Sequence, residues 1–165
     1  MTSSIESAFG SRLMTGGFLL NNQLTDFSFL PKSPEGGMVA NRVEGGKRPL
    51  SSMSPVIIFN QSNEPVMAVG SPGGRSIIAY VSRVIYDHIV GKEDLYSAVS
   101  GKHVVETGRL RLEPGINKSL VQALESKGHS PELKPQSSGV HALHVSSDGW
   151  VGVADPRREG AVTAK

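Results

Sequence analysis

The chain has 165 residues and a formal net charge of +2, from 17 Lys and Arg against 15 Asp and Glu. This near balance, without a basic run interleaved with aromatic residues, argues against nucleic-acid binding. The absence of Cys excludes disulfides, thiolate metal sites and a Cys nucleophile. The length gives one ordinary domain with its own core. Hydrophobic residues make up only 38%, however, and 19 Gly and 10 Pro predict much loop and turn.

We expect no membrane association. No segment approaches the roughly 18 apolar residues of a membrane span. The N-terminus lacks the basic-then-apolar order of a signal peptide, so we expect no export signal in this chain. This favours the cytoplasm and leaves the periplasm open.

The first third of the chain is predicted to be poor in regular structure. A buried strand begins the stretch 17–29 and turns polar at Asn21, and residues 30–49 form a loop with four Gly and three Pro. A loop of that length within a compact domain is usually functional or disordered. Two strands follow at 54–59 and 64–70, joined by the turn NQSN.

A helix over 77–89 is the best-supported element, and Gly91 fits its C-terminal stop. Its apolar stripe at helical spacing comprises Ile77, Ile78, Val81, Val84, Ile85, His88 and Ile89. Shorter helices are predicted at 93–101 and 116–128, the second with Leu120, Val121 and Leu124 facing inward.

Two further strand pairs complete the prediction. Residues 103–113 indicate two short strands around Thr107–Gly108, and 140–156 indicate a hairpin. Asp148–Gly149 is the two-residue signal of a type I′ turn. Helices mixed with hairpins predict an α+β fold with largely antiparallel sheets.

The loop GSPGGR, residues 70–75, lies between a strand and the main helix. Backbone N–H groups in such a loop attract negative charge, either a phosphate or the oxyanion of an acyl-transfer intermediate. The phosphate motifs do not fit, because neither G-x-x-x-x-G-K-[ST] nor G-x-G-x-x-G is present. An ordinary tight strand-to-helix turn is the alternative.

A second stretch, KRPLSSMSP at 47–55, ends the long loop. The adjacent hydroxyls of Ser51 and Ser52 could bind a carboxylate, although a Ser-rich turn is the commoner fate of such residues. FLLNNQLTDFSF, GKRPLSSMSP, GSPGGR and DPR occur in this order. With them the chain resembles the small-subunit part of the γ-glutamyltranspeptidase (glutathione hydrolase) family. The opening SIESAFGSR resembles the bacterial branch, which includes cephalosporin acylase-like members.

The resemblance implies an N-terminal nucleophile hydrolase with an αββα sandwich. A Thr exposed by self-cleavage attacks the γ-glutamyl carbonyl, with its own α-amine as base. The acyl group then passes to water or to an amine. Gly73 and Gly74 match the oxyanion hole, where a Cβ would block close approach.

The resemblance also assigns the γ-glutamyl pocket. Ser51 and Ser52 match the pair that binds the substrate α-carboxylate. Asp26 matches the acid that pairs with the α-amine, and Gln23 matches its polar neighbour. The alternative for Asp26 is a turn Asp.

Near the N-terminus the chain both matches the family pattern and departs from it. Ser4 matches a Thr that supports the nucleophile, and Glu6 stands where typical members have Asn, also on the amine. The nucleophilic Thr and its strand are expected upstream of Met1, and Thr2 does not match them. The large subunit, with an Arg that binds the α-carboxylate, is expected as a partner chain. The domain is expected to span 1–157, with 158–165 as a tail.

The histidines do not indicate a metal site. His88 fits a core or helix-end position, His141 and His144 point to opposite faces of one strand, and His103 and His129 are expected alone in loops. Asp155-Pro156-Arg157 is predicted to be structural. We expect no metal and no cofactor.

Three hypotheses follow. The chain is a truncated γ-glutamyltransferase or hydrolase acting on γ-glutamyl compounds such as glutathione, inactive alone. Alternatively, it is a non-catalytic remnant that self-associates or binds amino acids, because a missing strand exposes a sheet edge. The third, a relocated nucleophile at Thr2, would require activity that Thr2→Ala abolishes.

Overall fold

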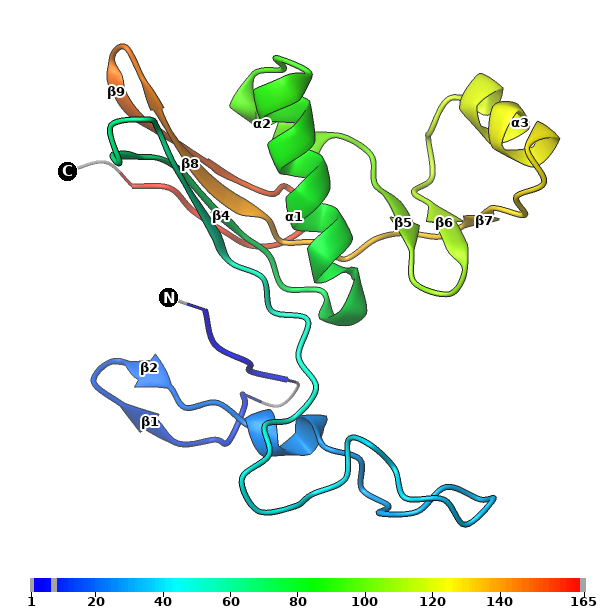
Figure 1. Cartoon of the computed structure of the whole chain (residues 1–165). Helices are drawn as coiled ribbons and strands as arrows, with labels where there is room; N and C mark the ends of the chain where they lie inside the picture. The colour runs from blue at the N-terminus through cyan, green and yellow to red at the C-terminus, as the bar shows by residue number, and fades with distance from the viewer. Residues whose placement is uncertain (1, 7–8, 164–165) are drawn as a thin grey trace. The chain divides into compact units, whose positions relative to one another are not determined.

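The computed structural model of the chain describes residues 2–6 and 9–163, so Met1 and the last two residues of the predicted tail lie outside it. The chain divides into two compact units, residues 1–51 and 52–165. Figure 1 traces both. Within the described residues, no helix is long and apolar enough to cross a membrane.

Unit 1 contains little regular structure. Its strands β1 (Met14–Thr15) and β2 (Phe18–Leu19) pair antiparallel, and the 3₁₀ turn η1 (Gln23–Asp26) follows. The strand expected within 17–29 is therefore only two residues long. The polar residues after it explain this, because the Asn21 side chain accepts a hydrogen bond from the Gln23 amide and favours a turn.

Unit 2 is built on a four-stranded antiparallel sheet in the order β3-β4-β8-β9. The strands are β3 (Val56–Phe59), β4 (Pro65–Gly70), β8 (His141–Ser146) and β9 (Gly149–Ala154). Helices α1 (Ile77–Ile85) and α2 (Leu95–Ser100) lie on one face of this sheet (Figure 1). The two hairpins predicted from sequence are confirmed.

The core lies between this sheet and these helices. Alternate residues of β4 face it, so Met67 and Val69 are buried, as are Tyr80, Val81 and Val84 of α1. Ile78, expected in the buried stripe, is 55% exposed. It lies one residue beyond the buried face of the helix.

Both ends of the main helix differ from a regular α-helix. The 3₁₀ turn η2 (Gly74–Ser76) precedes α1, and a π-helical turn, η3 (Tyr86–Val90), follows it before Gly91. A π-helical turn inserts one residue into the hydrogen-bonded ladder of an α-helix. His88 therefore lies in the π-helical turn rather than on the α-helical stripe.

A smaller sheet extends unit 2. It contains β5 (Val104–Glu106), β6 (Leu110–Leu112) and β7 (Glu132–Leu133), with β6 and β7 parallel and α3 (Lys118–Ser126) between them. The inward face predicted for α3 is formed only in part. Val121 and Leu124 are half-buried, whereas Leu120 is 42% exposed, and no residue of the helix is fully buried. Asn117 caps the helix by accepting a hydrogen bond from the Ser119 amide.

The final hairpin turns one residue earlier than predicted. Ser146 pairs with Gly149, so the loop residues are Ser147 and Asp148, and Gly149 begins β9 with φ of 114°. The mixture of helices with mainly antiparallel strands confirms the α+β class.

Candidate functional site

The first group of predicted site residues gathers around Asp26 in unit 1. The turn η1 places Gln23 three residues before Asp26, and its Nε2 donates a hydrogen bond of 2.6 Å to Asp26 Oδ2. Ser4 Oγ donates to the same oxygen at 3.4 Å, from a segment 22 residues away in sequence. All three side chains are half-buried. The cluster therefore presents a carboxylate held by two neutral donors.

Glu6 joins this cluster through its backbone. Its amide donates to Asn22 Oδ1 at 2.9 Å, and its carbonyl accepts from Asn22 Nδ2 at 3.2 Å. Its carboxylate accepts a 3.5 Å hydrogen bond from Thr25 Oγ1 and is exposed. Glu6 thus lies beside the turn that carries Asp26, and its role toward a substrate ammonium stays a prediction. Asn22 was not among the predicted site residues.

A second unpredicted residue, Asn41, ties the long loop to this cluster. Its Nδ2 donates to the Asp26 carbonyl at 2.7 Å, and its Oδ1 accepts from the Leu50 amide at 2.9 Å. The segment before Ser51 is thus fixed to the backbone that carries Asp26. The only signal in the sequence was an amide side chain within a loop rich in Gly and Pro.

The predicted serine pair lies at the division of the chain. Ser51 ends unit 1 and is exposed, whereas Ser52 begins unit 2 and is half-buried. Their proposed carboxylate binding remains a prediction.

The glycine loop of unit 2 contains two consecutive glycines with positive φ. Gly73 has φ of 137° and Gly74 has φ of 56°, both in the region that favours glycine. They open the helical segment, where amides precede the helix's own hydrogen bonds, and the Ser76 amide donates to the Gly73 carbonyl. Whether the amides of Gly73 and Gly74 donate to an oxyanion stays a prediction.

The two glycines differ in their surroundings. A Cβ on Gly73 would lie 2.6 Å from Tyr80 Cε2, so the side chain of Tyr80 packs directly beneath that residue. A Cβ on Gly74 would have no atom within 4 Å, so this residue is open on that side. One face of the loop is supported and the other is accessible.

His103, expected alone in a loop, is instead fully buried in a polar network. Arg83 Nε donates to its Nδ1 at 3.0 Å, which places the imidazole proton on Nε2. Nε2 lies 2.9 Å from Ser138 Oγ, and Ser138 donates to Asp155 Oδ2 at 2.6 Å. Burial, with Arg83 and Arg157 nearby, lowers the pKa of His103 to about 3. His103 is therefore neutral at pH 7.

This Ser-His-Asp set is not a catalytic triad. The hydroxyl proton of Ser138 goes to Asp155 rather than to His103, and His103 and Ser138 have no exposed surface. A nucleophile needs a base to accept its proton.

The Asp155-Pro156-Arg157 motif is structural, as predicted. Arg157 pairs with Glu113 at 2.7 Å and Asp155 at 3.0 Å, and it donates to the carbonyls of Ser100 and Gly101. Burial acts to raise the pKa of both carboxyls. Hydrogen bonds, from Arg157 to Glu113 and from Ser138 and Arg157 to Asp155, outweigh it and hold both pKa values below their ordinary range. The motif thus ties β9 to the end of α2.

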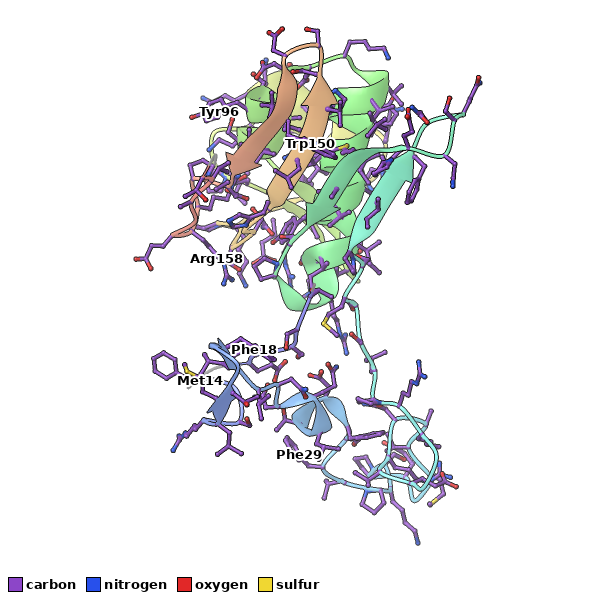
Figure 2. The ribbon with its side chains drawn as sticks, turned by 90° about the vertical axis from the view of Figure 1, so that its left-hand side faces the viewer. Met14, Phe18, Phe29, Tyr96, Trp150 and Arg158 are labelled. Carbon is purple, nitrogen blue, oxygen red and sulfur yellow. The ribbon has the colours of Figure 1, made fainter. Side chains whose placement is uncertain are left out.

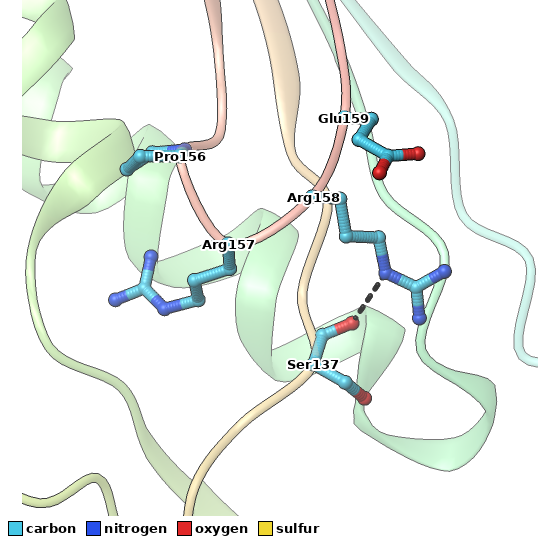
Figure 3. Close-up of a pocket in the computed structure, with 5 residues that line it drawn as sticks. All are labelled: Ser137, Pro156, Arg157, Arg158 and Glu159. Carbon is cyan, nitrogen blue, oxygen red and sulfur yellow. Dashed lines mark hydrogen bonds between the residues drawn. The ribbon is translucent and has the colours of Figure 1, made fainter.

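A shallow pocket lies beside this motif (Figure 3). It is lined by Ser137, Pro156, Arg157, Arg158 and Glu159. Arg157 and Arg158 point away from each other, and Arg158 Nε donates to the Ser137 carbonyl at 2.9 Å. None of the predicted site residues lines it.

His141 and His144 lie on opposite faces of β8, as the strand pattern predicts. His144 faces the helices, with its ring 4.5 Å from that of His88, whereas His141 lies beside the exposed Gly160. In residues 2–6 and 9–163, no three His, Asp or Glu side chains gather as they would around a metal ion.

Comparison with known proteins identifies the family. All 165 residues match the profile described as Gamma-glutamyltranspeptidase. The chain belongs to the γ-glutamyltranspeptidase family. It is 38% identical over 167 residues to a glutathione hydrolase proenzyme of Bacillus subtilis, covering 97% of this chain and 27% of that protein. The Escherichia coli proenzyme is 34% identical, with 99% and 30% covered.

Solved structures of this family have the same fold. A mutant γ-glutamyltranspeptidase of Helicobacter pylori superposes with a TM-score of 0.77 and 35% identity, covering 96% of this chain and 92% of that one. A cephalosporin acylase of Bacillus halodurans superposes at 0.73 with 20% identity, over 90% of this chain and 28% of that one, which shows a shared fold. The N-terminal nucleophile hydrolase fold is thereby confirmed.

The chain matches only part of its curated relatives. It spans 27% of the Bacillus subtilis proenzyme and 30% of the Escherichia coli proenzyme. It spans 92% of the matched Helicobacter pylori chain.

Proposed function

We propose that this chain supplies the oxyanion hole and part of the γ-glutamyl pocket of a γ-glutamyltransferase or glutathione hydrolase. The observation that carries the proposal is the position of the Gly73–Gly74 turn at the start of the helical segment, where backbone amides precede the helix's own hydrogen bonds and Gly74 is exposed. Membership of the family supplies the reaction class. The domain is proposed to span residues 1–157, followed by the tail 158–165.

The glycine amides act on the acyl-transfer step. When a hydroxyl attacks the γ-glutamyl carbonyl, the carbonyl oxygen becomes an oxyanion, and the amides of Gly73 and Gly74 donate to it. A preorganised donor of this kind contributes about 3 kcal/mol to the transition state. The open side of Gly74 supports this role, because no side chain occupies the space where its Cβ would be.

The Asp26 cluster holds the substrate's amino end. Asp26 receives hydrogen bonds from Gln23 and Ser4 that fix its orientation. A substrate α-ammonium donates to this carboxylate, with Glu6 as a second acidic neighbour. Ser51 and Ser52 are the proposed donors to a γ-glutamyl α-carboxylate. Asn41 and Asn22 position the segments that carry these residues.

The nucleophilic Thr and the large subunit come from outside this sequence, so the chain alone is inactive. The lengths matched support a two-chain protein, because proenzymes roughly three to four times longer have a solved relative with a chain of about this size. A large-subunit-like chain is the proposed partner.

The outer face of the four-stranded sheet supports such a partner. Ile57, Leu143 and Trp150 lie on the face opposite α1 and α2 and are 58%, 44% and 57% exposed. Figure 2 views the sheet from this side and labels Trp150. An antiparallel sheet with apolar residues on both faces needs a second layer to bury them. We assign this second layer to the large-subunit-like chain, because this sequence matches only 27% to 30% of the length of the proenzymes.

Purification from the native source tests the proposal. We expect the chain to co-purify with a larger partner, to begin with an upstream Thr, and to hydrolyse a γ-glutamyl anilide. The recombinant 165-residue chain alone should not hydrolyse it. A native chain of 17.5 kDa that lacks a partner and activity would overturn the proposal and favour the self-associating remnant. Activity of the chain alone that Thr2→Ala abolishes would favour the relocated nucleophile.

A further inference from the structure

The glycine loop rests on an aromatic side chain that no sequence motif marks. Tyr80 lies one and a half turns after the loop, and its Cε2 and Cδ2 lie 2.6 Å and 3.0 Å from where a Cβ of Gly73 would stand. Only 2% of Tyr80 is exposed. The Gly73 backbone therefore sits directly on the edge of this ring, and the missing side chain of Gly73 makes that approach possible.

Tyr80 is itself held from two sides. Its hydroxyl donates to Gln136 Oε1 at 2.9 Å, from a segment 56 residues away. Its ring packs against the ring of His103, with centroids 4.3 Å apart and planes tilted by 48°. A buried aromatic with both a ring contact and a satisfied hydroxyl has little freedom to move.

The contact with His103 connects the loop to the Asp155-Pro156-Arg157 motif. His103 is fixed by Arg83 on one nitrogen and by Ser138 on the other, and Ser138 is bonded to Asp155. The neutral state of His103 keeps both hydrogen bonds in one pattern. A continuous series of contacts thus runs from Asp155 through Ser138, His103 and Tyr80 to the loop.

We propose that Tyr80 is a positioning residue that holds the Gly73 and Gly74 amides in the orientation needed for an oxyanion, with His103 as its buttress. This inference rests on the proposed function of those amides. Two consecutive glycines have the greatest backbone freedom of any pair, so they do not define their own amide directions. Oxyanion stabilisation requires donors that are oriented before the charge develops.

The alternative is that Tyr80 is an ordinary core residue, and the two roles predict different effects of replacing it. If Tyr80 only fills volume, its replacement lowers global stability as any buried substitution of α1 would. If Tyr80 positions the loop, its replacement changes the loop amides specifically. Val84 provides the matched control, because it is fully buried on the same helix, one turn further from the loop.

Nuclear magnetic resonance on the full 165-residue chain separates these cases. In the unsubstituted chain we expect nuclear Overhauser effects between the Gly73 α-protons and the Tyr80 ring, and restricted fast motion at both glycine amides. Tyr80→Leu should shift and mobilise these amides. Tyr80→Phe, which keeps the ring, should leave the glycine amides with the shifts and restricted motion of the unsubstituted chain. Val84→Ala should leave them unchanged.

Each outcome bears on the inference. Absence of the Gly73–Tyr80 contacts in the unsubstituted chain would overturn it without any variant. Unchanged glycine amides in a folded Tyr80→Leu chain, or equal changes in Val84→Ala, would also overturn it.

The assembled native protein provides a second readout that separates the inference from the proposed function. There Tyr80→Leu should lower kcat on a γ-glutamyl anilide by about 10- to 100-fold with KM little changed, because misplaced groups cost rate rather than binding. Tyr80→Phe should retain kcat. Glycine amides that depend on Tyr80 in a native assembly without γ-glutamyl activity would preserve the support of the loop and refute the proposed function.

Discussion

At the residue scale, His103 makes folding depend on pH. Its pKa is about 3 in the folded chain and about 6.5 when unfolded. Between these values the unfolded chain binds a proton that the folded chain does not, so the free energy of unfolding falls as pH falls. One proton corresponds to about 1.4 kcal/mol per pH unit. Urea denaturation at pH 7, 6 and 5 should show this loss, and His103→Gln should reduce the slope.

The pH window isolates His103 from its acidic neighbours. The pKa values of Glu113 and Asp155 are held below their ordinary range, so their contributions are lost only as pH falls below about 4. His144 also has a lowered pKa, through burial and the nearby His88, and it contributes equally to both proteins. Identical slopes in the unsubstituted chain and in His103→Gln would show that His103 is not kept neutral.

Asp26 allows a test of substrate recognition in the assembled native protein. Asp26→Asn keeps the shape of the side chain but removes the charge that pairs with an ammonium. A hydrogen bond to a charged group contributes about 1.5–3 kcal/mol. We therefore expect kcat/KM on a γ-glutamyl anilide to fall by about 10- to 100-fold, measured by initial rates. Asp148→Asn, on the exposed hairpin turn, is the control, and an equal loss there would refute the assignment.

At the scale of elements, the glycine loop predicts unequal costs for two neighbouring substitutions. Gly74→Ala places a Cβ in open space at φ of 56°, which costs about 1 kcal/mol. Gly73→Ala combines φ of 137° with a contact of 2.6 Å to Tyr80, so it should cost at least about twice as much. Thermal or urea unfolding of both variants measures the difference. Equal losses would mean that the Tyr80 contact is not formed.

The helices and strands also show what the periodicity of apolar residues predicts about a fold. The β3–β4 and β8–β9 hairpins and the helix after the loop follow from alternation and helical spacing, because burial on one face dictates those patterns. In α3 the same reasoning succeeds in part for Val121 and Leu124, which are half-buried, and fails for Leu120. Leu120 has helical spacing within 116–128, but unit 2 places no layer over it, and it stays exposed. Periodicity indicates which face is apolar and does not indicate whether anything covers it.

The candidate site was predicted in a similarly uneven way. Short motifs marked the residues that would touch substrate, such as Gly73 and Asp26. Tyr80 was not found because no motif marks the contact of its ring with Gly73, although these residues are only seven apart in sequence. Asn41 was not found because its contact with Asp26 joins segments 15 residues apart. His103 was misjudged for the same reason. Its neighbours along the chain gave no sign that Arg83 and Ser138 would enclose it.

At the scale of the whole molecule, the outer face of the sheet predicts how the proposed partner binds, because the chain's own residues 160–162 cover this face only beside His141 and Gly152. Leu143 lies centrally on the outer face and is 44% exposed, and Ile78 lies on α1 and is 55% exposed. If the proposed large-subunit-like partner covers this face, a charge on it would have to be buried in the interface, which costs several kcal/mol. Leu143→Glu should therefore lower the amount of complex at least about tenfold, whereas Ile78→Glu should leave it unchanged.

Analytical ultracentrifugation of each variant mixed with the native partner measures the amount of complex. The same measurement on each free variant shows whether that variant is still folded. A charge at Leu143 changes little in the free chain because that side chain is already in contact with water. Loss of complex in both variants would indicate general destabilisation. Loss only in Ile78→Glu would place the partner on the helical face. Loss confined to Leu143→Glu would mean that the sheet of this chain is the inner layer of a two-chain sandwich.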